Sequence, residues 1–115
     1  MPELSIVVPV YRAADSLSEL YNRLDTVFDG YADELEFVFT EDCGGDDSWE
    51  VIERLAREDS RVCGLQLSRN YGQHNALLAG IRAARGSVII TMDDDLQHPP
   101  EELPKLLAKL NEGFD

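Results

Sequence analysis

Four short apolar runs constrain the fold of this 115-residue chain most strongly, because each is followed by polar residues and then by a segment with helical spacing. The runs occupy residues 4–11, 36–40, 62–67 and 87–92, and their apolar residues predict buried strands, most clearly in the β-branched run over residues 88–91. Strands that alternate with helices are typical of parallel sheets. We therefore predict an α/β fold: a doubly wound, mostly parallel sheet of about four strands with flanking helices.

The segments between the runs predict amphipathic helices. The first helix is marked by apolar residues with helical spacing: Leu17, Leu20, Tyr21, Leu24, Val27 and Phe28. We expect Asp15 or Ser16 to cap this helix, and Asp46 or Asp47 to cap the second. One face of the second helix carries three apolar residues: Trp49, Ile52 and Leu55.

Residues 75–84 predict a third helix that is rich in small residues, which allow close packing against a sheet. These small residues are Ala76, Ala79, Gly80 and Ala83. A last helix is expected after residue 100, with four leucines facing inward: Leu103, Leu106, Leu107 and Leu110.

The length and the charge limit the class of protein further. A chain of 115 residues forms one small domain at most. Its net charge is −13, and residues 1–59 contribute −12 of it through 16 acidic and 4 basic residues. We attribute this acidity to solvated helix faces and loops, and it disfavours nucleic-acid binding through a basic face.

The remaining composition predicts a cytoplasmic location. Cys43 and Cys63 give neither a disulfide framework nor the spacing of a zinc site, so a reducing compartment is expected. The apolar run over residues 6–10 is too short for a signal peptide and lacks a basic start, and no run in the sequence is long enough to span a bilayer.

Three consecutive aspartates stop the fourth run, and they predict a metal–diphosphate site. Because side chains alternate along an extended segment, Asp93 and Asp95 should point one way and Asp94 the other. Two carboxylates on one side repel each other unless a cation lies between them, and Gln97 could add a third oxygen ligand, which suits Mg²⁺ or Mn²⁺. The alternative is a solvated acidic turn. The carboxyl end of a buried parallel strand, where open α/β sheets bind ligands, favours the site.

Two other predicted strands also end in polar or aromatic residues. Tyr11 ends the first strand and could stack on a ligand base, although an aromatic residue there is more often a lid on the core. Glu41 and Asp42 follow the second strand, where a carboxylate could accept hydrogen bonds from a nucleobase or could simply cap a turn. Together the three strand ends predict a pocket for a nucleotide diphosphate.

Four motifs in this order closely resemble the family-2 glycosyltransferases of GT-A fold. They are VVPVY, FVFTEDCGGDDSW, LSRNYGQHNALLAGI and ITMDDDLQHPPEELPKLL. Within the family the chain looks most like the polyprenyl-phosphate branch, which contains dolichol-phosphate mannose synthases and bacterial undecaprenyl-phosphate sugar transferases. The resemblance covers residues 4–115 and identifies residues 1–115 as the N-terminal, nucleotide-sugar-binding part of such an enzyme.

The resemblance implies a role for several residues in holding the donor nucleotide. Pro9, Tyr11 and Asp42 would hold the nucleoside, while Arg69 and Asn70 would lie in a loop near the donor. In the same loop are Gly72 and His74; the histidine could be functional or simply packed and hydrogen-bonded.

The aspartate segment has its own implied roles. Asp93 and Asp95 would form the DxD pair, which reaches the ribose, the metal and the diphosphate, with Gln97 beside them as a metal ligand. Asp94 would also bind the nucleotide sugar, whereas the resemblance implies no role for His98.

Three positions depart from the family pattern. Arg12 and Ala13 stand where the family commonly has Asn and Glu after the tyrosine, so a carboxylate contact to the donor is lost. The usual DDGS turn begins here with Glu41, and Asp94 replaces the usual Ala inside DxD. These departures affect the identity of the donor more than the class of reaction.

The resemblance also implies the reaction, which is inverting transfer of a sugar from a nucleotide diphosphate to a polyprenyl phosphate or to a saccharide. A phosphate acceptor is already anionic near neutral pH, so it needs no general base. The catalytic acid of many relatives and the acceptor site lie beyond residue 115 in the family pattern. We therefore expect weak nucleotide binding, little or no transfer by this chain alone, self-association through exposed sheet surface, and a full-length protein at the cytoplasmic face of a membrane.

Other classes fit the sequence less well. A response-regulator receiver needs acidic residues at the end of the first strand, and a dinucleotide-binding domain needs GxGxxG there, but this strand ends in PVY. A diguanylate cyclase would follow its GGDD turn with a strand, and a haloacid-type phosphatase carries DxD at its first strand. The strongest competitor is a non-catalytic nucleotide-sugar or interaction module.

Overall fold

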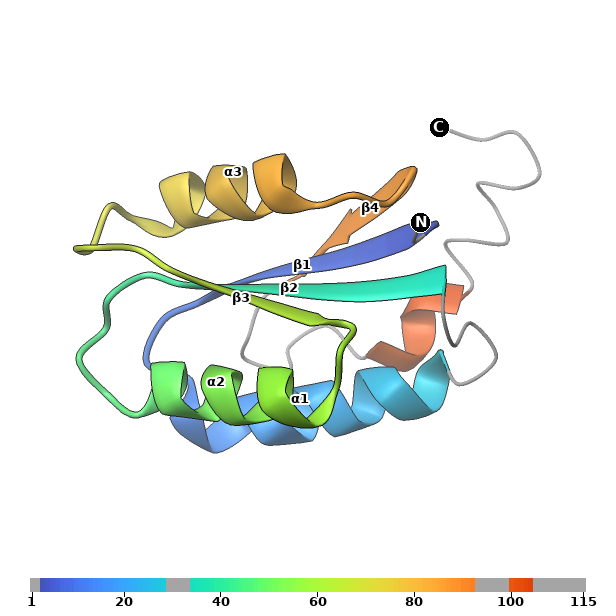
Figure 1. Ribbon diagram of the computed structural model, residues 1–115, viewed down its shortest axis with the longest axis horizontal. Helices are drawn as coiled ribbons and strands as arrows, with labels where there is room; N and C mark the ends of the chain where they lie inside the picture. Colours follow the sequence, from blue (N-terminus) through green and yellow to red (C-terminus); the bar gives the residue numbers. More distant parts are fainter. Residues whose placement is uncertain (1–2, 29–33, 93–99, 105–115) are drawn as a thin grey trace.

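A four-stranded parallel sheet forms the centre of the computed structural model, which describes residues 3–28, 34–92 and 100–104 (Figure 1). The strands are β1 (Leu4–Val10), β2 (Leu35–Glu41), β3 (Val62–Gln66) and β4 (Val88–Thr91). Their order is β3-β2-β1-β4, and every pairing is parallel. The predicted parallel α/β sheet is confirmed, and each observed strand begins and ends within one residue of its predicted bounds.

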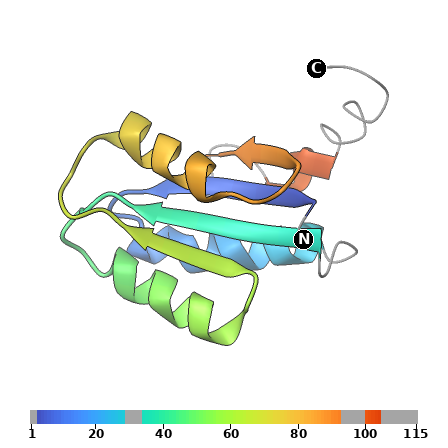
Figure 2. The ribbon, with the colours of Figure 1, turned by 45° about the horizontal axis from the view of Figure 1, so that its top comes forward.

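Helices cover both faces of the sheet, as the doubly wound prediction requires. They are α1 (Ala14–Val27), α2 (Ser48–Glu58) and α3 (Gln73–Ala83), followed by the short 3₁₀ helix η2 (Pro100–Glu102). Among the described helices, α1 and α2 lie together on one face, and α3 lies on the other (Figures 1 and 2). Of the four leucines expected after residue 100, Leu103 is buried, while Leu106, Leu107 and Leu110 lie outside the described residues.

The two central strands are buried at every position, because helices cover both of their faces. Alternate residues separate into two layers. Ile6, Val8 and Phe39 belong to the core beneath α1, together with Leu17 and Leu20 of that helix. Burying an apolar side chain of this size contributes about 1.5–3 kcal/mol, so this layer supplies most of the driving force for folding.

The opposite layer depends on the absence of a side chain at Gly80 in α3. A Cβ atom there would lie 2.5 Å from Val7 Cγ1 and 2.8 Å from Thr40 Oγ1. The helix therefore approaches the sheet as closely as its small residues predicted, and the approach brings the start of α3 towards the ends of β1 and β2.

The start of α1 differs from the prediction, because neither Asp15 nor Ser16 caps the helix. Ala13 is the N-cap residue. The Ala13 amide donates to Ser48 Oγ (2.8 Å) and the Ala14 amide donates to Asp46 Oδ2 (3.3 Å). Local spacing could not predict this, since the acceptors come from the start of α2, more than 30 residues away in the chain.

The start of α2 confirms one of its two predicted caps. The Ser48 amide donates to Asp46 Oδ1 (3.1 Å), whereas Asp47 makes no capping hydrogen bond. Asp46 therefore binds the first turns of both helices and fixes the two starts relative to each other at the carboxyl end of the sheet.

A network of polar side chains stabilises the opposite end of the sheet, where the strands begin. Arg61 donates to both carboxylate oxygens of Asp59, donates to Asp25 (2.6 Å), and stacks over the Phe37 ring at 5.4 Å. Tyr21 donates its hydroxyl to Asp59. The hydrogen bonds from Arg61 lower the pKa of Asp59 to about 2, and burial together with Asp59 raises the pKa of Tyr21 to about 12.

Asp59→Asn should reduce the free energy of unfolding at pH 7 by about 2 kcal/mol, because the folded pKa of Asp59 lies below its ordinary value of 3.8. A lowered folded pKa stabilises the protein above the unfolded pKa. That contribution is lost as the pH falls from about 4 to about 2. Urea denaturation across this range checks the prediction, with the exposed Glu53→Gln as control. Equal acid sensitivity of Asp59→Asn and the unsubstituted protein would contradict it.

Candidate nucleotide-binding site

The carboxyl ends of β1, β2 and β3 meet at one edge of the sheet. Val10 pairs with Glu41, and Glu41 pairs with Gln66. Past these pairs, the Asp42 amide donates to Val10 O and the Leu67 amide donates to Glu41 O, each at 2.9 Å. The connections to α1, α2 and α3 all leave from this end (Figure 2). Of the three strand ends predicted to form the pocket, the structure brings those of β1 and β2 together, with the end of β3 beside them.

Two buried carboxylates lie at the centre of this edge. Glu41 and Asp42 are each 3% exposed. Glu41 Oε2 accepts a hydrogen bond from the Gly44 amide (2.7 Å), so Glu41 acts as the turn cap that was one of its two predicted roles. Asp42 Oδ1 accepts one from the Tyr71 amide (2.9 Å), which attaches the loop between β3 and α3 to the end of β2. Within the described part of the chain, Asp42 Oδ2 has no hydrogen-bond partner.

The turn after β1 packs against the turn after β2. Arg12 Nε donates to Gly44 O (2.9 Å), and the Arg12 guanidinium lies 5.4 Å from the centre of the Tyr11 ring. Arg12 and Cys43 both have a positive φ, of 51° and 55°. Tyr11 is 44% exposed, so part of its surface is open to a ligand.

The loop between β3 and α3 is folded around Tyr71. The Arg69 guanidinium lies 4.8 Å from the Tyr71 ring centre, and Asn75 Nδ2 donates to Tyr71 O (2.7 Å). Asn70 Oδ1 accepts a hydrogen bond from the Gly72 amide (2.9 Å), and Gly72 has a φ of 94° that favours glycine. Asp42 therefore holds the loop that carries Arg69 and Asn70, two of the predicted site residues.

Two further residues named from the sequence can be placed. Pro9 is buried opposite Thr40 of β2. The pairing of β1 with β4 ends before Pro9, so the missing amide hydrogen of the proline leaves no gap between β1 and β4. His74 lies in the first turn of α3 with an exposed side chain, and the alternative of a packed histidine is therefore wrong.

The aspartate segment cannot be described in the same way. Asp93, Asp94, Asp95, Gln97 and His98 lie outside the described residues. The chain reaches them from β4, where the Met92 amide donates to Val7 O at 3.1 Å. Across residues 3–28, 34–92 and 100–104, no group of three or more His, Cys, Asp or Glu side chains could hold a metal ion. The predicted metal site therefore depends on the aspartate segment.

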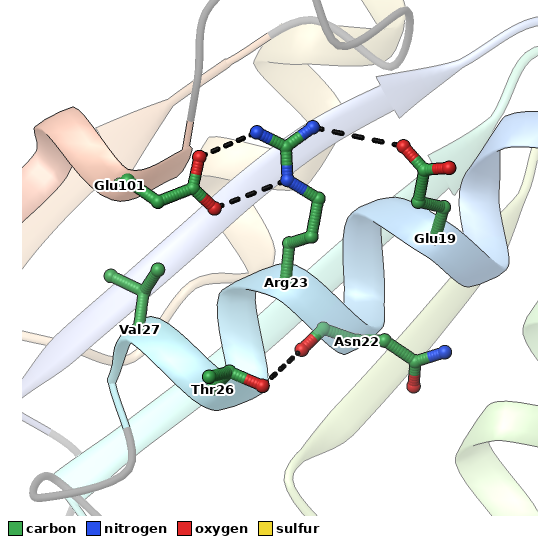
Figure 3. A pocket seen from close by; sticks show the side chains of 6 residues that line it. All are labelled: Glu19, Asn22, Arg23, Thr26, Val27 and Glu101. Atoms are coloured by element: carbon green, nitrogen blue, oxygen red, sulfur yellow. Dashed lines mark hydrogen bonds and ion pairs between the residues drawn. The ribbon is translucent and has the colours of Figure 1, made fainter.

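A hollow of about 480 Å³ lies elsewhere, between α1 and η2 (Figure 3). Arg23 reaches across it, donating to both oxygens of Glu101 and lying 3.7 Å from a Glu19 oxygen. The Arg23–Glu101 pair is partly exposed, and such ion pairs contribute little to stability. The hollow lies away from the strand ends, and its residues add nothing to the candidate site.

Comparison of the sequence with protein-family models identifies the family of this chain. The model described as "Glycosyl transferase family 2" matches residues 5–115. The chain belongs to this glycosyltransferase family. The expected family membership is thereby confirmed, with a match over nearly the whole chain.

Relatives in the polyprenyl-phosphate branch match the chain closely. The chain is 50% identical over 113 residues to the undecaprenyl-phosphate 4-deoxy-4-formamido-L-arabinose transferase of Shewanella sediminis, covering 97% of this chain and 34% of the relative. It is 43% identical to the transferase of that name from Edwardsiella ictaluri, covering 97% of this chain and 35% of the relative. The chain thus spans about a third of the length of these relatives.

Solved glycosyltransferase structures share the fold. S. aureus TarS 1-349 in complex with UDP matches with a TM-score of 0.80 and 26% identity, over 97% of this chain and 32% of that one. A mannosyltransferase of Pyrobaculum calidifontis, solved with GDP-Man and Mn²⁺, matches with a TM-score of 0.75 and 23% identity, over 94% of this chain and 32% of that one. These matches confirm the predicted GT-A type of sheet. No helix in the described part of the chain is long and apolar enough to cross a membrane.

Sequence reasoning missed two participants in this edge. Gly44 had no expected role, although a Cβ there would lie 2.9 Å from Arg12 Cγ and 3.0 Å from Arg12 N. Tyr71 was also missed, although it is 43% exposed and anchors to Asp42. In the sequence, only its aromatic residue type and its place between Asn70 and Gly72 could have indicated a role for Tyr71.

Asp42→Ala should release the loop that carries Tyr71, because the Tyr71 amide loses its buried acceptor. We expect this amide to exchange with solvent about tenfold faster, as for the loss of a hydrogen bond worth about 1.4 kcal/mol. Asp42→Asn keeps an oxygen at the same position and serves as the matched control. Hydrogen exchange followed by NMR measures both, and equal protection of Tyr71 in Asp42→Ala and the unsubstituted chain would contradict the prediction.

Proposed function

We propose that this chain is the nucleotide-sugar-binding part of a glycosyltransferase that transfers a sugar from a nucleotide diphosphate to a polyprenyl phosphate. The observation that carries the proposal is the 50% identity, across 97% of the chain, to an undecaprenyl-phosphate sugar transferase. The assembled strand ends support it, since ligands bind at the carboxyl edge of open α/β sheets.

The described residues suggest how the nucleoside is held. The exposed ring of Tyr11 offers a surface on which a base can stack. Asp42 Oδ2, which has no partner in the described part of the chain, can accept a hydrogen bond from an imide or amide of the base. Pro9, a buried residue of β1 opposite Thr40, belongs to the same proposed nucleoside site. Arg69 and Asn70 lie in the loop that Asp42 anchors, and their role is to contact the anionic part of the donor.

Asp93, Asp95 and Gln97 would hold a divalent ion, Mg²⁺ or Mn²⁺, because hard oxygen ligands suit both ions. The donor set fits such an ion chemically, and the described residues offer no competing cluster. When bound, the ion supplies positive charge that stabilises the leaving diphosphate. We assign Asp94, the middle residue of the three, to binding of the nucleotide sugar.

The acceptor and the sugar follow from the relatives. These relatives are named for undecaprenyl phosphate and 4-deoxy-4-formamido-L-arabinose, which we propose as acceptor and sugar here. UDP is the first nucleotide to test, because the TarS structure contains it. A phosphate acceptor is already ionised near neutral pH and requires no catalytic base, in contrast to a saccharide hydroxyl.

The length of the match determines what the chain can do. It spans about a third of its relatives, and we propose that the acceptor site lies in the other two thirds of such an enzyme. We expect residues 1–115 alone to bind nucleotide weakly and to transfer no sugar. We also propose that the full-length protein lies at the cytoplasmic face of a membrane. The chain itself is proposed to self-associate through exposed sheet surface.

Binding of UDP to the purified chain should depend on the metal and on Asp95. We expect Mn²⁺ to strengthen binding, and Asp95→Asn to weaken the Mn²⁺-dependent part roughly 10- to 100-fold, as for disturbance of a metal site. Calorimetry with UDP, with and without Mn²⁺, measures both effects. Asp47→Asn, which removes an exposed acid near the same edge, is the matched control.

Two outcomes would contradict the proposal. Binding of UDP that ignores the metal and survives Asp95→Asn would reject the metal site and favour a non-catalytic nucleotide-binding module. Failure of UDP, GDP and dTDP sugars to bind at millimolar concentration would reject nucleotide recognition by this edge altogether.

A further inference from the structure

Arg12 has an unusual backbone conformation at the candidate site. Its φ of 51° lies in the left-handed region, which residues with a Cβ adopt rarely and glycine adopts readily. Glycine would therefore suit this turn better as far as the backbone is concerned. The Arg12 side chain must make contacts that compensate for the conformation, and those contacts indicate what the residue does.

Both contacts of the side chain involve the surface on which a base would stack. Nε donates to Gly44 O at 2.9 Å, and the guanidinium carbon lies over the Tyr11 ring, 5.4 Å from its centre. Gly44 completes the contact, because a Cβ at that position would meet Arg12 Cγ at 2.9 Å and Tyr11 Cδ1 at 3.4 Å. One arginine thus connects the turn after β1, the turn after β2 and the exposed tyrosine.

The charge of Arg12 is not used in an ion pair within the described residues. The only hydrogen bond of its guanidinium there is the one from Nε to Gly44 O. The buried carboxylates nearby bind elsewhere: Glu41 binds the Gly44 amide and Asp42 binds the Tyr71 amide. An arginine that forms no ion pair here, but stacks on an aromatic ring and donates from Nε, uses its planar shape, which lysine cannot reproduce.

We propose that Arg12 is a positioning residue for the nucleobase of the donor. It holds the Tyr11 ring in place from one face and joins the ring to the Gly44 turn, so that the base stacks on a surface that is already ordered. The inference rests on the proposed function and adds a residue at which this chain departs from the pattern of its family. Arg12 touches Tyr11 and Gly44, and acts on the donor through them.

The test compares Arg12→Gly with Arg12→Lys by titrating UDP into each purified chain and following it by NMR. Both substitutions should weaken binding about five- to tenfold, which corresponds to partial loss of one base–aromatic stack. The melting temperature of Arg12→Gly should stay unchanged or rise, because glycine accepts the positive φ. Lower affinity without lower stability is the signature of a positioning role.

Two further variants sharpen the test. Arg82→Lys changes an exposed arginine on α3 in the same way and should leave UDP binding unchanged. In a Tyr11→Leu background, Arg12→Gly should cause little additional loss of UDP affinity, because the residue acts through the tyrosine ring.

Several results would overturn the inference. Affinity retained in Arg12→Lys would show that a positive charge near the phosphates is sufficient. Affinity retained in Arg12→Gly would show that the side chain has no role, and a melting temperature that falls together with affinity would show that Arg12 supports the fold. Failure of the unsubstituted chain to bind UDP would reject the proposed function itself, which separates that failure from a failure of this inference.

Discussion

The hydrogen bonds accepted by two buried carboxylates at the end of β2 hold the functional edge of this structure together. A buried charge is costly unless it is hydrogen-bonded, so Glu41 and Asp42 need donors close by. The amides of Gly44 and Tyr71 supply them, from the turn after β2 and from the loop after β3. Because both carboxylates lie at the end of β2, the strand between β1 and β3, the loops beside the strand ends are fixed relative to one another.

The same logic extends to the starts of the helices at this edge. Ser48 and Asp46 accept the first amides of α1, and Arg12 joins the turn before α1 to Gly44. Tertiary contacts therefore hold the starts of α1 and α2 and the ring of Tyr11. An edge cross-linked in this way presents its polar groups before a ligand arrives, which reduces the entropy lost on binding.

The sequence predicted the parts of this structure that arise from periodicity and chain direction. Alternating strands and helices predicted the parallel sheet, and the small residues around Gly80 predicted the close approach of α3. Sequence could not predict which groups meet across the edge, because those contacts join residues about 30 positions apart. For this reason Asp15 and Ser16 were wrongly expected to cap α1, and the contact between Arg12 and Gly44 was missed. The positive φ of Arg12 could not be predicted either, because arginine has no preference for the left-handed region.

The most direct test of this account maps where UDP binds on the chain, by the shifts of backbone amide resonances in NMR spectra. The account predicts the largest shifts at the carboxyl edge, at Tyr11, Gly44 and Tyr71. Little change should occur at the other end of the sheet, where Arg61 lies. Shifts that cluster around Arg61, or in the hollow between α1 and η2, would contradict the central claim that the joined strand ends form the nucleotide site.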